Sequence, residues 1–171
     1  LPPDFPESPV MFVGHNFDSI KAHSDALANG GEIGTQFWKT LKAFLRAADE
    51  LDPADCFFTN TLMGVKPGGA DGPMPDCEGY RPQCQRFLRR QIEIVRPRSI
   101  LVLGDDAQGQ LRKARRLDAA GAAIHFEKAM HPSTRPVNQR PNREQWIVAQ
   151  GGKIAAEIAT APLYYASAGF R

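Results

Sequence analysis

SILVLG, residues 99–104, narrows the possible folds at once, because it is apolar from Ile100 to Leu103 without a break. Strands of antiparallel sheets commonly alternate polar and apolar residues, since one of their faces meets water. An unbroken apolar strand is instead typical of a parallel sheet that helices cover on both faces. Parallel strands are joined by crossover connections that usually contain a helix. This segment therefore predicts an α/β fold.

The rest of the chain alternates strands and helices as such a fold requires. We predict further strands at residues 10–14, 56–62 and 124–130, and helices near residues 35–51, 82–95, 107–116 and 143–160. We predict loops for the polar, glycine-containing residues 20–34 and for the Gly- and Pro-rich residues 63–82. The pattern predicts one domain over residues 1–171, a three-layer α/β/α sandwich around a central, mainly parallel, four-stranded sheet.

Polar side chains follow three of the predicted strands, at the point where each strand ends. VMFVGHNFDS, residues 10–19, runs from an apolar strand into His15, Asn16 and Asp18. Asn60 lies at the end of the aromatic strand CFFTNTL, and His131 follows the last strand. In open parallel sheets, ligands bind beyond the carboxyl ends of the strands. The sequence therefore predicts a site where these ends meet.

Each of these residues also has a structural interpretation when it is considered alone. Asn16 could cap a turn, where Asn is common, and an isolated His such as His131 is more often structural than catalytic. Asn60 needs a hydrogen-bonding partner in an apolar strand, which either a ligand or the protein itself could supply. Gly14 allows a tight turn or a close approach of the backbone, but no phosphate-binding glycine motif follows it.

Charge is distributed unevenly along the chain, although the net charge is only +2. Residues 1–60 hold 4 Lys and Arg against 9 Asp and Glu, whereas residues 61–171 hold 17 against 10. Residues 81–116 alone contain 10 basic residues. This segment predicts either a polyanionic partner or the solvated face of a helix.

The spacing of cysteine and histidine residues is unlike that of a metal site or a disulfide framework. The three cysteines form no CxxC pair, and the histidines form no HxxxH pair. We therefore expect no metal and no cofactor, and a protein suited to the reducing cytoplasm. No apolar run approaches the roughly 20 residues that span a bilayer, so we expect no membrane partner.

The order of five motifs resembles the uracil-DNA glycosylase superfamily. These motifs are VGHNFDS, QFWKTLKAFL, FFTNTL with the Gly- and Pro-rich residues after it, CQRFLRRQIEIVRPRSILVLG, and MHPSTR. The resemblance covers residues 10–158, nearly the whole chain. RQIEIVRPRSILVLGDDA and FFTNTLMGVKP are similar to the fourth, iron–sulfur family, without most of its cysteines. GHN is more similar to the mismatch-specific and single-strand-selective branches, and QFWKTL is also similar to the mismatch-specific branch.

This resemblance implies a monofunctional glycosylase that hydrolyses the N-glycosidic bond of uracil, flipped out of DNA, in base excision repair. It implies that Asn16 orients the attacking water, that Asn60 reads the base edge and that His131 contacts the carbonyl between the two ring nitrogens. Asp18 competes with Asn16 for the catalytic role, because a carboxylate stabilises an oxocarbenium ion better than an amide does.

The resemblance also implies contacts around the base and along the DNA. The uracil would meet the backbone near Gly14, His15 and Phe17, with Phe17 or Phe37 stacking on the ring. The expected DNA contacts are Ser133, Arg135, Arg140, Arg143 and Lys66. The implied partners are DNA containing uracil and free uracil as the product. We expect a monomer with neither a metal ion nor an iron–sulfur cluster.

A second hypothesis is a non-catalytic or weakly active protein of the same fold that binds nucleic acid or a nucleobase. Phe17 stands where the family places a proline, which favours this hypothesis, whereas Asn60 and His131 favour the enzyme. A third hypothesis, an enzyme that cleaves free nucleosides, leaves the basic character of residues 81–143 without a purpose.

Overall fold

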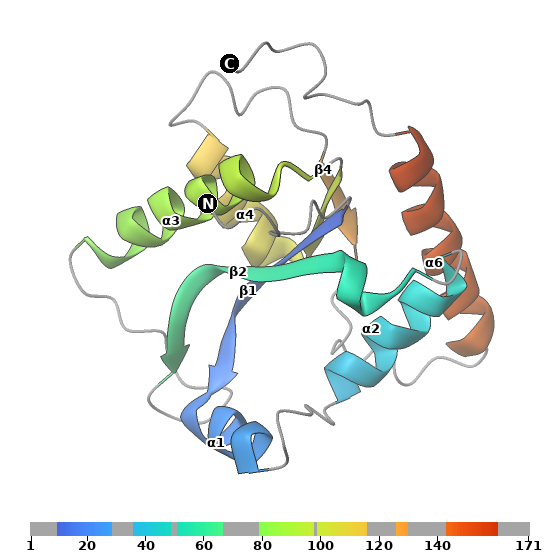
Figure 1. Cartoon of the computed structure of the whole chain (residues 1–171), viewed down its shortest axis with the longest axis horizontal. Coiled ribbons are helices and arrows are strands. Elements are labelled where there is room, and N and C mark those ends of the chain that lie inside the picture. The colour runs from blue at the N-terminus through green and yellow to red at the C-terminus, as the bar shows by residue number, and fades with distance from the viewer. Residues whose placement is uncertain are drawn as a thin grey trace.

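A parallel sheet forms the centre of the protein. The computed structural model describes residues 10–28, 36–48, 51–66, 79–97, 99–115, 126–129 and 143–160. The strands are β1 (Val10–Ser19), β2 (Cys56–Lys66), β3 (Ser99–Leu103) and β4 (Phe126–Ala129), and their order in the sheet is β2-β1-β3-β4 (Figure 1). Every neighbouring pair is parallel.

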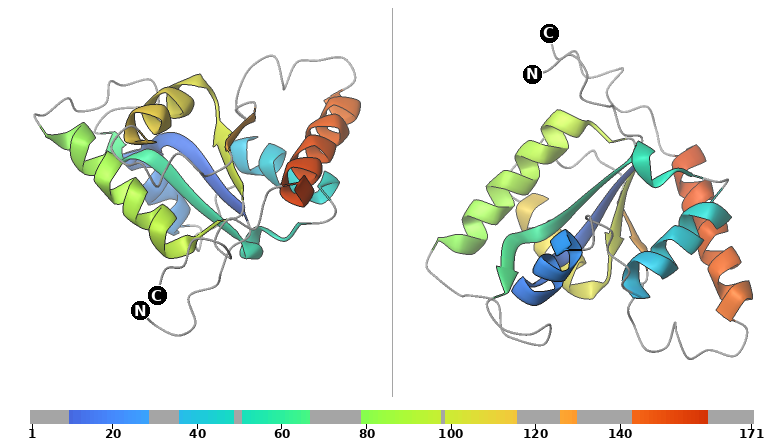
Figure 2. Two further views of the ribbon diagram at one scale, coloured as in Figure 1. Left: turned by 90° about the horizontal axis from the view of Figure 1, so that it is seen from above. Right: turned by 60° about the horizontal axis from the view of Figure 1, so that its bottom comes forward.

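Helices cover both faces of this sheet (Figure 2). The helices α2 (Gln36–Ala47) and α6 (Arg143–Thr160) lie on one face, and α3 (Tyr80–Val95) and α4 (Asp105–Arg115) lie on the other. A short helix, α1 (Ile20–Ala28), directly follows β1, and a single 3₁₀ turn, η1 (Pro53–Asp55), precedes β2. Because β1 and β2 point toward α1 in Figure 1, this helix marks the carboxyl edge of the sheet.

The alternation of side chains along β1 and β3 builds a separate core on each face. Val10 and Phe12 of β1, with Leu101 and Leu103 of β3, pack against α2 and α6. The intervening residues, Met11, Val13, Ile100 and Val102, pack against α3 and α4. Successive side chains of a strand point to opposite faces, so two fully covered faces require an unbroken apolar run. All five residues of β3 are buried.

The predicted α/β class, with a parallel sheet and helices on both faces, is confirmed. The structure corrects the loop that we predicted for residues 20–34, because residues 20–28 form α1. The prediction failed because the large apolar side chains that the structure describes in α1 are not buried: Ile20 is 52% exposed and Leu27 is 66% exposed. Its support is local, since it contains good helix formers and an ion pair of 2.7 Å between Lys21 and Asp25, one turn apart.

Close backbone contact joins α2 to α6. A Cβ atom on Gly151 of α6 would lie 2.6 Å from the carbonyl carbon of Ala47 in α2, so no larger residue fits there without displacing a helix. The next residue, Gly152, has no such neighbour within 4 Å. Among the helices that the structure describes, none is long and apolar enough to cross a membrane.

Candidate active site

Gly14 and Asn60 lie side by side near the middle of β1 and β2, one residue beyond the last β1–β3 pair, Val13 and Val102. The structure corrects the strand ends that we predicted, because β1 continues to Ser19 and β2 to Lys66. Gly14 and Asn60 are register partners on these neighbouring strands. A Cβ atom on Gly14 would lie under 3.0 Å from Asn60 Oδ1, a separation that real Cβ atoms essentially never show. The carboxamide of Asn60 therefore lies directly over the Cα of Gly14. The absence of a side chain at Gly14 gives Asn60 this position.

Asn16 follows at the next position on the same side of β1. It pairs with Leu62 of β2, and it is half-buried. Since Phe12 faces α2 and α6, strand alternation places Gly14 and Asn16 on that face as well. Asn60 shares this face through its pairing with Gly14. The structure thus brings together three of the residues that the sequence selected.

The HNFD segment, residues 15–18, departs from regular strand pairing with β2. The β1–β2 register shifts between Asn16 and Phe17, and again between Phe17 and Ser19. Irregularities of this kind bend a strand and redirect its side chains, and they are frequent next to active sites. The structure describes only the backbone of Phe17 and Asp18, so it does not choose between Asn16 and Asp18 as the catalytic residue.

His15 points to the opposite face, away from Asn60. Its Nδ1 lies 3.6 Å from Oδ2 of Asp106, in the first turn of α4. Its carbonyl oxygen accepts a hydrogen bond of 2.9 Å from the Thr61 hydroxyl. The Thr61 bond ties the backbone of the HNFD segment to β2, which favours the expectation that the backbone of His15, more than its ring, serves the site.

The sequence analysis did not select Asp106, although polar residues that directly follow a predicted strand were its criterion for a candidate site. Asp105 and Asp106 follow the carboxyl end of β3, just as His15 and Asn16 follow the apolar residues of the strand that the sequence predicted at residues 10–14. Thr61 carried no such signal, because a threonine in a strand is ordinary.

Phe37, a candidate for stacking on the base, belongs to a chain of aromatic rings on the Asn60 face. The rings of Phe37 and Trp38 are 5.5 Å apart, edge to face, and Trp38 in turn lies 5.1 Å from Phe58. Phe58 stacks on Phe12 at 5.1 Å. Phe37 is partly buried against the core and lies in the first turn of α2. Its own helix thus holds it on the face where Gly14 and Asn60 meet.

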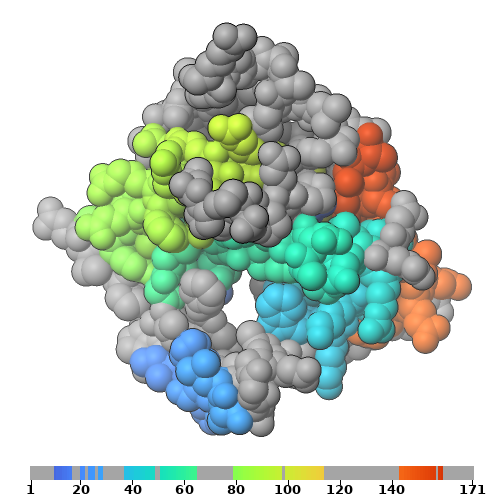
Figure 3. All heavy atoms as spheres, in the orientation of Figure 1, coloured from blue at the N-terminus to red at the C-terminus, as the bar shows by residue number. Residues whose placement is uncertain are grey.

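A gap lies beside β2 and α2 in the space-filling view (Figure 3). Gly14 and Asn60 lie midway along β1 and β2, and Asn16 follows two residues further along β1. The two carboxamides, of Asn16 and Asn60, share one face of the sheet. This arrangement suits a planar ligand that hydrogen-bonds at its edge.

Several predicted residues fall beyond what the structure describes. His131, Ser133, Arg135 and Arg140 lie outside the described residues, and only the backbone of Lys66 is described, at the end of β2. Arg143 begins α6, where its guanidinium donates a hydrogen bond of 3.3 Å to the hydroxyl of buried Thr40 in α2. Its described contact therefore joins two helices, and a DNA contact of Arg143 stays a prediction.

The resemblance pairs Cys84 with one iron–sulfur ligand position, and Gly64 stands where that family has the preceding cysteine. The Cys84 sulfur accepts a hydrogen bond of 3.4 Å from the amide of Met63. A Cβ atom on Gly64 would lie 2.5 Å from the Tyr80 hydroxyl, so the Tyr80 side chain fills the space beside Gly64. In the described part of the chain, no three His, Cys, Asp or Glu side chains gather as metal ligands do.

The comparison with protein families agrees with this geometry. The model of the uracil DNA glycosylase superfamily matches residues 2–151, which is most of the chain. No curated protein matches the chain. The matched residues include β1 and β2, the two strands that carry Gly14, Asn16 and Asn60. The superfamily that the sequence motifs suggested is therefore confirmed, and the chain belongs to the uracil DNA glycosylase superfamily.

Proposed function

We propose that this protein excises uracil from DNA by hydrolysing the N-glycosidic bond, as a monofunctional glycosylase without a cofactor. Membership of the superfamily supports a glycosylase-type hydrolase that acts on DNA. The observation that favours uracil is the Asn60 carboxamide, which lies over Gly14 on the face of the sheet that α2 and α6 cover.

A carboxamide fits the edge of uracil. Its oxygen can accept a hydrogen bond from N3–H, and its amino group can donate one to O4. Cytosine presents an acceptor at N3 and a donor at N4, so the same amide would leave buried polar groups without partners. A site that hydrogen-bonds one base in this way rejects the other strongly. The contact with Gly14 holds the oxygen of Asn60 to one side and would fix the direction of this recognition.

Bond cleavage creates positive charge on the sugar and negative charge on the leaving base. In this proposal, His131 and the backbone N–H groups near Gly14 stabilise the leaving uracil. Asn16 holds the attacking water, and Asp18 is the alternative catalytic group because a carboxylate stabilises an oxocarbenium ion. The base must leave the DNA stack to reach this site.

Excision assays on defined DNA test the proposal. Single- and double-stranded oligonucleotides with one uracil should yield alkali-labile abasic sites and free uracil, whereas matched oligonucleotides with thymine should not. Binding to the uracil oligonucleotide with no excision of either form would instead establish the non-catalytic hypothesis.

Substitutions at Asn60 and in the HNFD segment test the roles within the site. Asn60→Asp should weaken uracil excision and admit some cytosine, because the carboxyl group changes the donor and acceptor pattern. Asn16→Ala should lower single-turnover excision more than Asp18→Asn does. A larger reduction with Asp18→Asn would move the catalytic role to Asp18, and undiminished excision by Asn60→Ala would show that Asn60 does not read the base.

A further inference from the structure

We propose that the outer surface of α3, extended by α4, is a second nucleic-acid site that binds a single strand through an exposed aromatic ring between arginines. This surface lies on the face of the sheet opposite to Asn60, and the proposed excision does not use it. It explains part of the basic segment at residues 81–116, which the candidate active site leaves without a role.

The helix α3 has one buried stripe and one exposed stripe. Cys84, Leu88, Ile92 and Val95 are buried. The opposite side carries Gln83, Arg86, Phe87 and Arg90, all of them exposed at helical spacing. Phe87 is 54% exposed, which is unusual for a ring on a polar helix and leaves one of its faces available to a planar partner.

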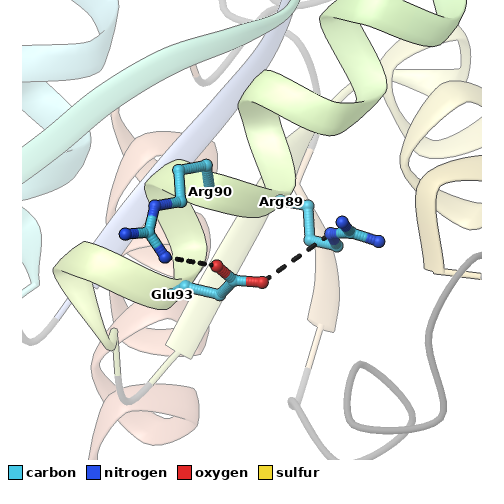
Figure 4. Close-up of polar contacts among 3 residues, drawn as sticks. All are labelled: Arg89, Arg90 and Glu93. Atoms are coloured by element: carbon cyan, nitrogen blue, oxygen red, sulfur yellow. Dashed lines mark hydrogen bonds and ion pairs between the residues drawn. The ribbon is translucent and has the colours of Figure 1, made fainter.

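Positive charge surrounds this ring. The helix contains four arginines and a single acid, Glu93. Figure 4 shows that Glu93 lies between two of these arginines, with Arg90 at 2.9 Å and Arg89 at 3.7 Å. One carboxylate thus orients two guanidinium groups and neutralises only one charge. In the described residues, no acidic side chain pairs with Arg86, next to Phe87.

The neighbouring helix continues the charge. Arg112 and Lys113, in the second half of α4, are exposed, and among the described residues neither has an acidic partner. The helices α3 and α4 pack side by side on the same face of the sheet. Both begin at the carboxyl edge and run away from it, since Tyr80 contacts Gly64 and Asp106 contacts His15. Phe87 therefore lies about 10 Å along its helix from that edge.

The combination favours a single nucleic-acid strand over an acidic peptide. Proteins that bind single strands combine cations that follow the backbone with aromatic rings on which bases stack. Stacking needs only an accessible ring face, and Phe87 offers one on the outside of a helix. An acidic peptide pairs with clustered arginines alone, so it would not account for the exposed ring of Phe87.

The test measures binding of a fluorescein-labelled 20-nucleotide oligo(dT) without uracil, by anisotropy at several salt concentrations, with the full chain. Phe87→Ala and Phe87→Leu should both bind about 5- to 150-fold more weakly, because neither retains an aromatic face. The double variant Arg86→Ala, Arg112→Ala should lower the log–log salt slope by about 0.7 for each phosphate that the protein no longer neutralises.

Matched controls come from the opposite face of the sheet. Val148→Ala on α6 removes another exposed apolar side chain, and Arg46→Ala on α2 removes another exposed cation; neither should change the affinity or the slope. Affinity retained by Phe87→Leu would overturn the stacking role, and an unchanged slope in the double variant would overturn the phosphate contacts. Competition by polyglutamate as strong as by oligo(dT) would show that the surface binds acidic peptides instead. Because the probe contains no uracil, the result is independent of whether the chain excises that base.

Discussion

Gly14→Ala should inactivate the candidate site by moving Asn60, with little effect on folding. Gly14 does not have a positive φ angle, so its backbone accepts alanine. The difficulty is space, because the new methyl group would meet the Asn60 oxygen at under 3.0 Å, whereas ordinary contact begins at 3.4 Å. The amide must therefore move by roughly 1 Å, and a displacement of this size can cost about 100-fold in rate.

The effect on stability should be much smaller than the effect on rate. Overpacking a core typically costs about 1–3 kcal/mol, but here the new methyl group meets the end of a side chain and not the backbone. Alanine also recovers about 0.5–1 kcal/mol because it restricts the unfolded chain more than glycine does. Urea denaturation should therefore show a free energy of unfolding within about 1–2 kcal/mol of the parent protein.

Single-turnover excision of uracil by three variants isolates the cause. Gly14→Ala and Asn60→Ala should each be slow, and the double variant should be no slower than Asn60→Ala, because the methyl group then meets no amide. If the two rate reductions multiply in the double variant, Gly14 acts by a route other than Asn60. Full activity of Gly14→Ala would refute the assignment of Asn60 to the base-reading position. Gly152→Ala, at a glycine with open space, is the control.

Three other predictions concern the rest of the molecule. Gly151→Ala should lower the free energy of unfolding by about 1–3 kcal/mol, whereas Gly152→Ala should raise it by about 0.5–1 kcal/mol; equal shifts in urea denaturation would contradict the close α2–α6 contact. His131→Ala should reduce single-turnover excision by about 100- to 1,000-fold, as expected when one donor to the leaving group is removed, and a near-normal rate would remove His131 from the site. Burial, with Asp55 and Asp52 nearby, raises the pKa of Cys56 to about 12. At pH 8 iodoacetamide should therefore alkylate Cys56 about a thousandfold more slowly than a free cysteine, measured by peptide mass spectrometry, and rapid labelling would disprove its protonated state.

The sequence predicted a strand or helix correctly where its buried residues follow a regular pattern along the chain. SILVLG predicted a strand covered on both faces, and β3 is buried throughout, because the apolar character of such a strand does not depend on which neighbours cover it. The same argument identified α3, whose buried residues recur at helical spacing. It failed for α1, whose large apolar residues, Ile20 and Leu27, are both exposed and so do not follow a buried helical spacing.

The motifs also identified candidates for the site, but they could not arrange them. Asn16 and Asn60 were selected because polar groups at strand ends are expected to meet. Which atom meets which depends on register, and a shift of one residue moves a side chain to the other face of the sheet. Only the folded structure shows that the Asn60 amide lies over Gly14 and that the His15 ring lies near Asp106 on the other face of the sheet.

The sequence by itself thus determined the α/β class and the superfamily. The class depends on hydrophobic patterns and the superfamily on the order of motifs. Both can be read from the sequence without knowing which distant residues meet in the fold. The tertiary structure decided the Gly14–Asn60 contact and the Thr61 bond to the backbone of the HNFD segment. Each of these depends on the positions of distant segments relative to one another, which the packing of both sheet faces fixes at once.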